Sequence, residues 1–458
     1  MHIGVFCMDL SHLFSSHSLR AFSFEGGVRP ADEKQFSKDH PILDFMDPQQ
    51  EMVFFMLQHQ GEPCEPVVKE GEKVFRDQLI GSPKGLGAPV YSSVSGIVKA
   101  IEPRLHPNGQ MIMSVVVDND HMYETLPAKF PPASFMELTK EEILERIRFA
   151  GIVGMGGDGY PTFPKLVSAM QKPIDHVLLN GCECEPYLSS DYRVMLEDSW
   201  RVVNGLKIVL SLFPEAKGII CMEHNKPDAV EALGEHVQDD EKIRICTLKS
   251  KYPSGDEKVL IESVLRRQIP AGMKAEDASC VVLNIDTSVA ISRAVTQARP
   301  LERRIITIAG DCVRNPGNYR VRVGTSFSEL LEQVSPLAKR PRRVIYGGPM
   351  MGNAVNSLDF PVVKTSSCIL LLSSKSPSRS EETACIRCGQ CLTACPVHLE
   401  PFRLYEALMK DDQTLFSKLN GDLCTGCGCC SYVCPAKRDL TEIISKRNWQ
   451  PEGAEEES

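Results

Sequence analysis

The chain contains no apolar run of the length that a membrane-spanning helix needs. About 20 consecutive apolar residues are required to cross a bilayer, and no segment of the 458 residues reaches that length. The N-terminus also lacks the basic region, apolar stretch and small-residue cleavage site of a secretory signal. From the sequence we therefore expect a cytoplasmic protein that is soluble or lies at the periphery of a membrane.

Blocks of positive charge are absent as well. The chain has 51 Lys and Arg against 60 Asp and Glu, which gives a formal net charge of -9. Because binding to nucleic-acid phosphates needs clustered Lys and Arg, we expect no nucleic-acid partner. A chain of 458 residues is also too long for one hydrophobic core, so several domains are expected.

Cysteine, in contrast, is abundant. Eight of the 18 cysteines form two copies of the spacing Cys-x-x-Cys-x-x-Cys-x-x-x-Cys-Pro near the C-terminus. This spacing is typical of proteins with two [4Fe–4S] clusters, in which the fourth cysteine of each run ligates the other cluster. We expect one cluster on Cys385, Cys388, Cys391 and Cys434, and the other on Cys395, Cys424, Cys427 and Cys430.

The spacing disfavours a zinc site, and the cysteines outside the two runs have no assigned role. A zinc ribbon needs only paired cysteines in a tetrahedral site, and does not require the third and fourth cysteines or the repeated Cys-Pro. Cys429 is an additional thiol inside the second run, and we interpret it as a bystander. The other cysteines are scattered without a disulfide framework, which indicates a reducing compartment.

The first half of the chain changes character twice. Residues 1–40 have few periodic signals and are interpreted as an extension, whereas 41–125 contains short β runs separated by glycines. This second segment resembles the barrel-sandwich fold of biotinyl and lipoyl carrier domains. Lys84 is nearest to the position of their modified lysine, but its flanking residues differ, so we expect a structural or docking module.

An α/β region follows at 138–300. Thr139 and Glu142 form a capping box, the apolar stripe after them predicts a helix, and Gly151 ends it. Short apolar runs at 176–179, 218–221 and 280–283 are typical of buried parallel strands.

The remaining segments are shorter. A β-rich region at 301–365 has one helix near 328–333, and a Ser-rich linker at 373–380 leads to the cluster region at 381–445, with a helical piece at 402–418. An acidic tail is expected at 446–458.

Five glycines lie in the nine residues 151–159, followed by a Tyr-Pro-Thr-Phe-Pro-Lys segment. The letters satisfy the Gly-x-Gly-x-x-Gly fingerprint, but that fingerprint requires a strand before the loop, and here a helix precedes it. Glycines still let backbone N–H groups approach a phosphate, the next helix offers its N-terminus, and Lys165 could add a charge. The pattern alone leaves two readings open, a phosphate loop or a structural glycine turn.

Polar groups follow several predicted strands. Glu183 and Glu185 come after the strand that ends near Asn180, Asp256 and Glu257 lie in another loop, and 284–287 follows a further strand. In α/β sheets, ligands bind outside the carboxyl ends of the strands. We therefore expect these loops to form one shared pocket.

These motifs together resemble a known family. Residues 154–162 are similar to the flavin loop Gly-x-Gly-Gly-Ala-Gly-Phe-Pro-Thr, which is shared by the NADH-oxidising flavoprotein subunit of respiratory complex I and by the RnfC family of the Rnf (Rsx) electron transport complex. The Glu-Cys-Glu-Pro motif at 183–186, the Tyr-Pro-x-Gly segment at 252–255, the Gly-Gly-Pro-Met-Met-Gly segment at 347–352 and the tandem cysteine runs resemble the RnfC family across nearly the whole chain. The flavoprotein of complex I has a single cluster.

The resemblance implies a multidomain α/β plus β fold. Its parts would be an unmodified barrel-sandwich domain at 41–125, a Rossmann-like FMN/NADH domain at 138–300, a β-grasp (SLBB-like) domain at 301–365, and a helical dicluster ferredoxin domain at 381–445.

Carried over residue by residue, the resemblance also implies a flavin site. Non-covalent FMN would contact Gly154, Gly156, Gly157, Gly159, Lys165, Asn180, Glu183, Glu185, Asn284 and Thr287. NAD(H) would stack on the flavin, with Tyr160, Glu183 and Glu257 as further contacts. No catalytic acid or base is assigned. Asp158 and Tyr160 stand where the family has alanine and phenylalanine, and Asp158 puts a carboxylate beside the expected phosphate.

The implied function is that of a peripheral electron-transfer subunit of a membrane ferredoxin:NAD⁺ oxidoreductase. NAD exchanges two electrons as a hydride and a cluster passes one, so a flavin is needed between them. Expected partners are integral membrane subunits, which would translocate the ions, an iron–sulfur subunit, and ferredoxin directly or through a partner. The expected location is the cytoplasmic face of the inner membrane. Two alternatives are a cobalamin reductase built from the same modules and a non-catalytic iron–sulfur redox or scaffold protein.

Overall fold

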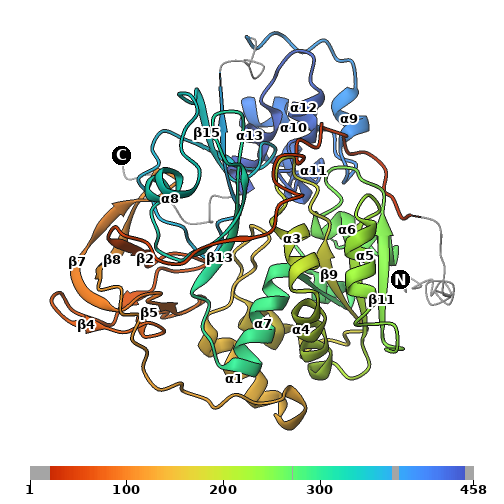
Figure 1. Ribbon diagram of the computed structural model, residues 1–458. Helices are drawn as coiled ribbons and strands as arrows, with labels where there is room; N and C mark the ends of the chain where they lie inside the picture. Colours follow the sequence, from red (N-terminus) through yellow and green to blue (C-terminus); the bar gives the residue numbers. More distant parts are fainter. Residues whose placement is uncertain (1–20, 271, 374–380, 449–458) are drawn as a thin grey trace.

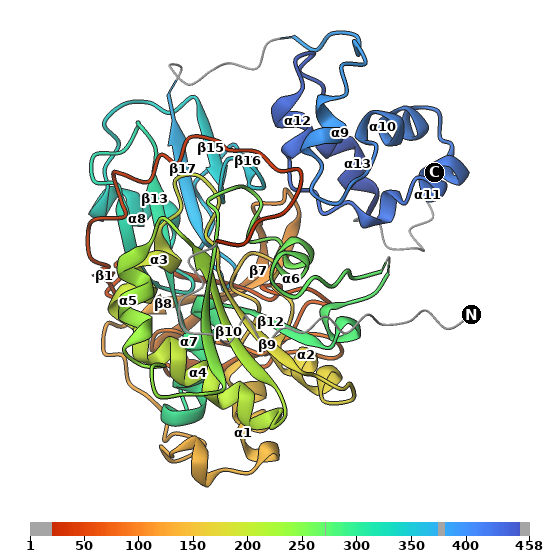
Figure 2. The ribbon, with the colours of Figure 1, turned by 90° about the vertical axis from the view of Figure 1, so that its right-hand side faces the viewer.

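The computed structural model describes residues 21–270, 272–373 and 381–448. Most of the expected linker and acidic tail lie outside these residues. The described part has four packed regions, followed along the colour gradient in Figure 1, with the C-terminal helical region set off from the others in Figure 2. Among the described helices, none is both long enough and apolar enough to cross a membrane.

The first region consists of two small antiparallel sheets. Their short strands alternate buried and exposed residues, and a core of Met52, Phe54, Ile80 and Val115 lies between the sheets. One sheet has the order β2 (Met52–Phe55), β8 (Met111–Asn119), β7 (Gly96–Leu105), β4 (Lys73–Val74), and the other has the order β3 (Glu65–Pro66), β5 (Leu79–Ser82), β6 (Val90–Tyr91). Lys84 lies in the loop after β5 and forms an ion pair with Glu65 of β3.

The second region is a four-stranded parallel sheet with helices on both faces. Its strand order is β11 (Ile243–Leu248), β10 (Lys217–Glu223), β9 (His176–Gly181), β12 (Cys280–Asn284). The helices are α1 (Lys140–Ala150), α2 (Thr162–Ala169), α3 (Ser190–Glu197), α4 (Ser199–Leu212), α5 (Pro227–Gly234), α6 (Glu257–Leu265) and α7 (Ile285–Gln297). The chain leaves β9 toward β10 and later returns on its other side as β12, so the order of the strands reverses between β9 and β12. Ligands bind at such a point in parallel α/β sheets.

The capping box predicted at the start of α1 is confirmed. The Thr139 side chain accepts from the Glu142 backbone N–H, and the Glu142 side chain accepts from the Thr139 backbone N–H. Gly151 ends the helix with a φ of 64°, a conformation that glycine adopts without strain. The polypeptide therefore enters the glycine-rich segment from a helix, as the sequence indicated.

The third region is a six-stranded mixed sheet with one helix, α8 (Phe327–Val334). Its order is β1 (Leu43–Phe45), β14 (Gly317–Arg322), β13 (Arg303–Ala309), β17 (Cys368–Leu372), β15 (Arg343–Tyr346), β16 (Asn353–Val355). The edge strand β1 comes from residues that the sequence analysis assigned to the barrel sandwich, but it pairs in parallel with β14. A strand of three residues is too short to show an alternation of apolar and polar side chains. Its place in the fold therefore depends on the strand with which it pairs.

The fourth region holds both cysteine runs and consists of short helices, α9 (Gln390–Ala394), α10 (Pro401–Met409), α11 (Gln413–Lys418), α12 (Cys429–Val433) and α13 (Leu440–Asn448). The expected helical piece at 402–418 is two helices, because the chain turns at Lys410 and Asp411, which has a φ of 52°. One-turn 3-10 helices lie at Phe135–Glu137, Ala275–Ala278 and Gly421–Leu423.

Residues 21–38 form a strap across the second and fourth regions, although this segment has few periodic signals in its sequence. Phe22 donates a backbone hydrogen bond to Thr247 at the end of β11, and Gly27 donates one to Ala394 in α9. In Figure 2 this red segment crosses the upper middle of the view and reaches the side of the blue helices. The strap therefore joins the parallel sheet to the cysteine-rich region.

Candidate functional site: two cysteine groups beside a glycine loop

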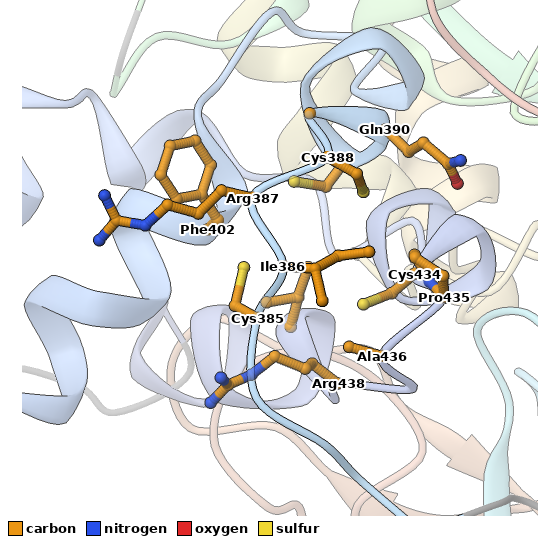
Figure 3. Close-up of a pocket in the computed structure, with 13 residues that line it drawn as sticks. Cys385, Ile386, Arg387, Cys388, Gln390, Phe402, Cys434, Pro435, Ala436 and Arg438 are labelled. Carbon is orange, nitrogen blue, oxygen red and sulfur yellow. The ribbon is translucent and has the colours of Figure 1, made fainter.

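The first cysteine group surrounds one cavity. Cys385, Cys388 and Cys391 line it together with Cys434, which comes from the end of the second run. Figure 3 shows the labelled cysteines with their sulfur atoms turned toward the space between them. Apolar side chains such as Ile386 and Phe402 complete the wall. This arrangement has the crossed pattern in which the fourth thiol is supplied by the other run.

The second group is more deeply buried. Burial raises the pKa of the Cys424 thiol to about 11 and that of Cys430 to about 12, and both thiols interact electrostatically with Cys427 and Cys395. Cys395, from the first run, also accepts a 3.3 Å hydrogen bond from the Leu399 backbone N–H. Such N–H···S bonds are among the means by which a protein tunes an iron–sulfur cluster.

The spacing of these thiols bears on which metal group fits. Within the described ranges, no three His, Cys, Asp or Glu side chains converge closely enough to hold a single metal ion. The four thiols of the first group instead line a shared cavity. Ligands spread around a cavity suit the corners of a cubic cluster better than a tetrahedral zinc site, which draws its ligands to about 2.3 Å from one ion.

The glycine loop lies against the end of β12 and the start of α7, beside the point where the strand order reverses. Its two ends are joined by backbone hydrogen bonds, Gly154 N–H to Tyr160 O at 2.8 Å and Gly159 N–H to Gly154 O at 3.0 Å. Gly157 has a φ of 112°, and a Cβ there would meet nothing within 4 Å. Among the described residues, the backbone N–H groups of Gly156 and Gly157 have no acceptor. Free N–H groups of consecutive residues form a concave site for an anion.

Charged side chains surround this loop. The Lys165 ammonium lies 3.1 Å from the Glu257 carboxylate. Burial alone would lower the pKa of Lys165, but the carboxylates of Glu257 and Asp158 outweigh it and raise that pKa. Burial raises the pKa of Asp158, and Lys165 offsets part of this effect. The half-buried cation of Lys165 and the free N–H groups of the loop both fit the phosphate of FMN, whereas the Asp158 carboxylate opposes it.

The strand-end residues of the expected flavin set lie next to the loop. The Met155 N–H donates a 2.9 Å hydrogen bond to the Thr287 hydroxyl, and a Cβ on Gly156 would lie 3.3 Å from Cβ of Asn284. Asn180 donates to the Gly255 carbonyl at 2.7 Å and so joins the next loop to the group. These contacts bring the start of α7 and the loop before α6 next to the glycine loop and β9.

Tyr160 lies at the outer side of this group. Its hydroxyl accepts a 3.2 Å hydrogen bond from the Lys274 ammonium, which also lies 4.8 Å from the centre of the ring. The phenylalanine found in the family at this position could not make the hydrogen bond.

The carboxylates Glu183 and Glu185 have other partners. Glu183 is buried and accepts from the backbone N–H groups of Asp191 and Tyr192, at 2.9 and 3.4 Å, so it caps the start of α3. Glu185 accepts from the N–H groups of Met350 and Met351, at 3.2 and 2.9 Å, and thereby holds the 347–352 loop of the mixed sheet. Burial raises the pKa of Glu185 to about 7. Both side chains fix the walls of the site.

Asp191 belongs to the site, although the sequence analysis did not select it. Its carboxylate accepts a 2.6 Å hydrogen bond from the Asn284 side chain, and burial, followed by the charges of Glu183 and Asp286, raises its pKa to about 7. The sequence did offer one signal for Asp191, because it lies in the first turn of the helix that follows the Glu-Cys-Glu-Pro motif.

Tyr252 joins the flavin-side loops to the cysteine-rich region. Its side chain is 2% exposed, and its hydroxyl donates a 2.7 Å hydrogen bond to the backbone carbonyl of Cys427. The ring packs in one apolar cluster with Cys184, Met350 and Cys429. The second cysteine group therefore faces the strand-end loops, whereas Cys388 of the first group is exposed.

Family models match each of the four regions. The RnfC barrel sandwich hybrid domain matches residues 22–122, the Nuo51 FMN-binding domain 147–293, the SLBB domain 305–354 and the 4Fe-4S dicluster domain 384–437. These matches confirm the expected fold class and the expectation of FMN and two [4Fe–4S] clusters as cofactors.

Known proteins are similar to this chain over most of their length. The C subunit of the Na⁺-translocating ferredoxin:NAD⁺ oxidoreductase complex of Acetobacterium woodii is 38% identical over 84% of this chain and 87% of its own. The C subunit of the proton-translocating complex of Clostridium ljungdahlii is 40% identical over 85% of both chains. An NAD⁺-reducing [NiFe]-hydrogenase structure has a TM-score of 0.49 and 17% identity, over 70% of this chain and 63% of that one, which is too distant to place any residue. On the identity and coverage of its relatives, the protein belongs to the family of C subunits of ion-translocating ferredoxin:NAD⁺ oxidoreductase (Rnf) complexes.

Proposed function

We propose that this protein passes electrons between two [4Fe–4S] clusters, FMN and NAD(H) as the peripheral electron-transfer subunit of a ferredoxin:NAD⁺ oxidoreductase. The observation that supports this most is the packing of the second cysteine group against the loops at the carboxyl ends of the parallel strands. The hydrogen bond from Tyr252 to the Cys427 carbonyl is part of that interface. Electron transfer needs short separations, and this interface joins the two predicted cofactor sites without intervening solvent at the buried Tyr252.

The residues that would hold FMN fall into two groups. The free N–H groups of Gly156 and Gly157, with Lys165, would receive the phosphate. Asn180, Asn284 and Thr287 stand at the ends of β9 and β12 and line the same edge. The flavin supplies the exchange between hydride transfer and single-electron transfer. Tyr160 and Glu257, on the outer side, remain the proposed contacts of NAD(H).

The eight cysteines would ligate the clusters in the crossed pattern, with Cys434 on the first cluster and Cys395 on the second. The second cluster would exchange electrons with the flavin, since its group contacts Tyr252. The first would exchange electrons with an outside donor, since Cys388 is exposed and Ile386 beside it is 67% exposed. The order from outside to inside is therefore donor, first cluster, second cluster, flavin, NAD.

The partners follow from the family. The named relatives are subunits of ion-translocating complexes, and we propose that this chain docks on integral membrane subunits that move the ions, at the cytoplasmic face of the inner membrane. An iron–sulfur subunit, or ferredoxin itself, would deliver electrons at the exposed face of the first cluster.

Anaerobic purification followed by iron and flavin analysis tests the proposal. Two [4Fe–4S] clusters require about eight iron atoms per chain, and one FMN should accompany them. NADH should then bleach the visible absorption of the clusters. Full iron with no flavin and no NADH oxidation would overturn the proposal in favour of a scaffold, and reduction of cob(II)alamin with NADH would point to a cobalamin reductase.

A further inference from the structure

A second cavity lies on the far side of the glycine loop. It has a volume of about 330 Å³, is partly open to solvent, and is lined by the end of α3, the start of α4, α7, the segment that leads into β13, and β14. None of the residues proposed to contact FMN or NAD(H) lines it. Its volume is within the range of about 300–1,000 Å³ that is typical of sites for small molecules.

The walls of this cavity are rich in arginine. Six arginines and four carboxylates line it, so the lining has two positive charges in excess: Arg201, Arg293, Arg299, Arg303, Arg304 and Arg320, with Glu197, Asp198, Asp286 and Glu302. Apolar side chains, among them Val194, Val289 and Leu301, form the rest of the surface. The excess is notable in a chain whose net charge is -9.

Most of these arginines already have partners. Arg201 pairs with Asp198 at 2.7 Å, and Arg299 pairs with Asp77 at 2.6 Å. Arg320 pairs with Asp44 outside the cavity.

Arg304 forms part of the wall and also supports the glycine loop. It is 2% exposed, pairs with Asp286, and donates to the carbonyls of Met155 and Ser366 at 3.1 and 2.9 Å. Its guanidinium is therefore already occupied by protein groups.

Two arginines differ from the others. Among the described residues, neither Arg293 nor Arg303 has a carboxylate within ion-pair distance or a hydrogen-bond acceptor for its guanidinium. Burial lowers the pKa of Arg293, with Glu302 acting against the effect and Arg201 adding to it. A partly buried guanidinium with unused donors is costly, and the cost is removed when an anion accepts its hydrogen bonds.

We propose that this cavity binds a small organic anion, with a phosphate or carboxylate group held by Arg293 and Arg303 and an apolar part against Val289 and Leu301. Guanidinium groups match both oxyanions, because their fork of N–H donors binds two oxygens at once. The site is separate from the proposed electron path, and no step of that path requires it.

Calorimetric titration of the holo-protein tests this proposal. The protein is loaded with its clusters under anaerobic conditions and saturated with FMN, so that the glycine loop cannot take up the probe. Inorganic phosphate and succinate are titrated separately in chloride buffer at constant ionic strength. We expect saturable binding of at least one probe, with one site per chain. Phosphate alone would indicate a phosphate-bearing ligand, and succinate alone a dicarboxylate.

Variants then locate the binding. Arg293→Gln and Arg303→Gln should each weaken it by about tenfold or more, as expected on losing charged hydrogen bonds, whereas Arg293→Lys should weaken it less. Arg104→Gln is the matched control, because Arg104 is an arginine on β7 that pairs with Glu51 and Glu102 away from the cavity. The absence of saturable binding for both probes would overturn the proposal. So would binding by Arg293→Gln and Arg303→Gln that equals the wild type.

Discussion

The hydroxyl of Tyr252 donates a 2.7 Å hydrogen bond to the backbone carbonyl of Cys427, and this bond joins the loop after β11 to the second cysteine group. Tyr252→Phe keeps the ring and removes the donor, so a buried carbonyl is left unpaired at a cost of about 1–3 kcal/mol. We expect unchanged iron and FMN contents, a lower unfolding temperature, and slower bleaching of the clusters after rapid mixing with NADH.

Tyr319→Phe is the control for this experiment. Tyr319 is also 2% exposed and donates a 2.8 Å hydrogen bond to the Asn315 carbonyl, but it lies in the mixed sheet. It should lower the unfolding temperature without slowing cluster reduction. If Tyr252→Phe reduces its clusters as fast as the wild type does, Tyr252 is not part of the electron-transfer interface.

The crossed arrangement of the cysteines predicts which cluster each variant loses. Cys434→Ser should lose the cluster that Cys385→Ser also loses, and about half of the iron with it, because Cys434 lines the cavity of the first run. Cys429→Ala should retain both clusters, since Cys429 lies outside the regular spacing of Cys424, Cys427 and Cys430. Electron paramagnetic resonance of the reduced proteins distinguishes the two clusters. A Cys434→Ser spectrum that matches that of Cys424→Ser would contradict the crossed pattern.

Asp158 should weaken the binding of FMN. Its carboxylate belongs to the same loop as the free N–H groups and interacts electrostatically with Lys165, so it lies near the expected phosphate. Asp158→Ala removes this like charge and should tighten FMN several-fold, whereas Lys165→Met should loosen it by about tenfold or more. Fluorescence titration of the flavin measures both. Weaker FMN binding by Asp158→Ala would show that the carboxylate supports the loop.

The affinity for FMN should also depend on pH in a way that Asp158 explains. Because burial raises the pKa of Asp158 above its ordinary value, the group is protonated at a higher pH than a solvated aspartate. FMN should therefore bind more weakly as the pH rises through that pKa. Comparison with Asp158→Ala separates this effect from the titration of the flavin phosphate, which both proteins share.

The lowered pKa of Lys364 should make the free energy of unfolding depend on pH in alkaline solution. This residue is 1% exposed, and its ammonium donates to the carbonyls of Pro89 and Gly151 at 2.6 and 2.8 Å. Burial lowers its pKa from 10.5 to about 8. Between these values the unfolded chain binds more protons than the folded one, so the folded state gains stability as the pH rises, by about 3 kcal/mol in total.

Unfolding temperatures of the wild type and Lys364→Met between pH 7.5 and 10 measure this effect. As the pH increases, the unfolding temperature of the wild type should rise relative to that of Lys364→Met. Lys226→Met serves as the control. Although burial opposes it, the carboxylates of Glu223 and Glu183 raise the pKa of Lys226, so no such change is expected. A parallel pH course for the wild type and Lys364→Met would contradict the assignment.

Local signals in the sequence predicted the parts of the fold that depend on near neighbours. The capping box at Thr139, the stop at Gly151 and the runs that became β9, β10 and β12 depend on residues a few positions apart. The crossed cysteine pattern could be expected for the same reason, since the fixed spacing within each run determines which thiols can reach a shared space.

Contacts between distant residues could not be predicted in this way. The sequence pattern predicted Glu185 as a ligand group at a strand end, but its carboxylate is bound by N–H groups at Met350 and Met351, in another region. Leu43–Phe45 joins the mixed sheet because β14 offers it an edge. The arginine-lined cavity draws on α4, α7, β13 and β14, and no short motif contains them.

The strap has a consequence for how the protein matures. Gly27 is bonded to Ala394, so the beginning of the described chain holds a helix from its cysteine-rich end. A ribosome makes the strap first and its partner last, and domains made early fold early. The flavin region can thus be complete while the final region still awaits iron. In an iron-starved cell, chains would accumulate in which the first three regions are folded. Their cysteine-rich region would be undocked and exposed to proteases.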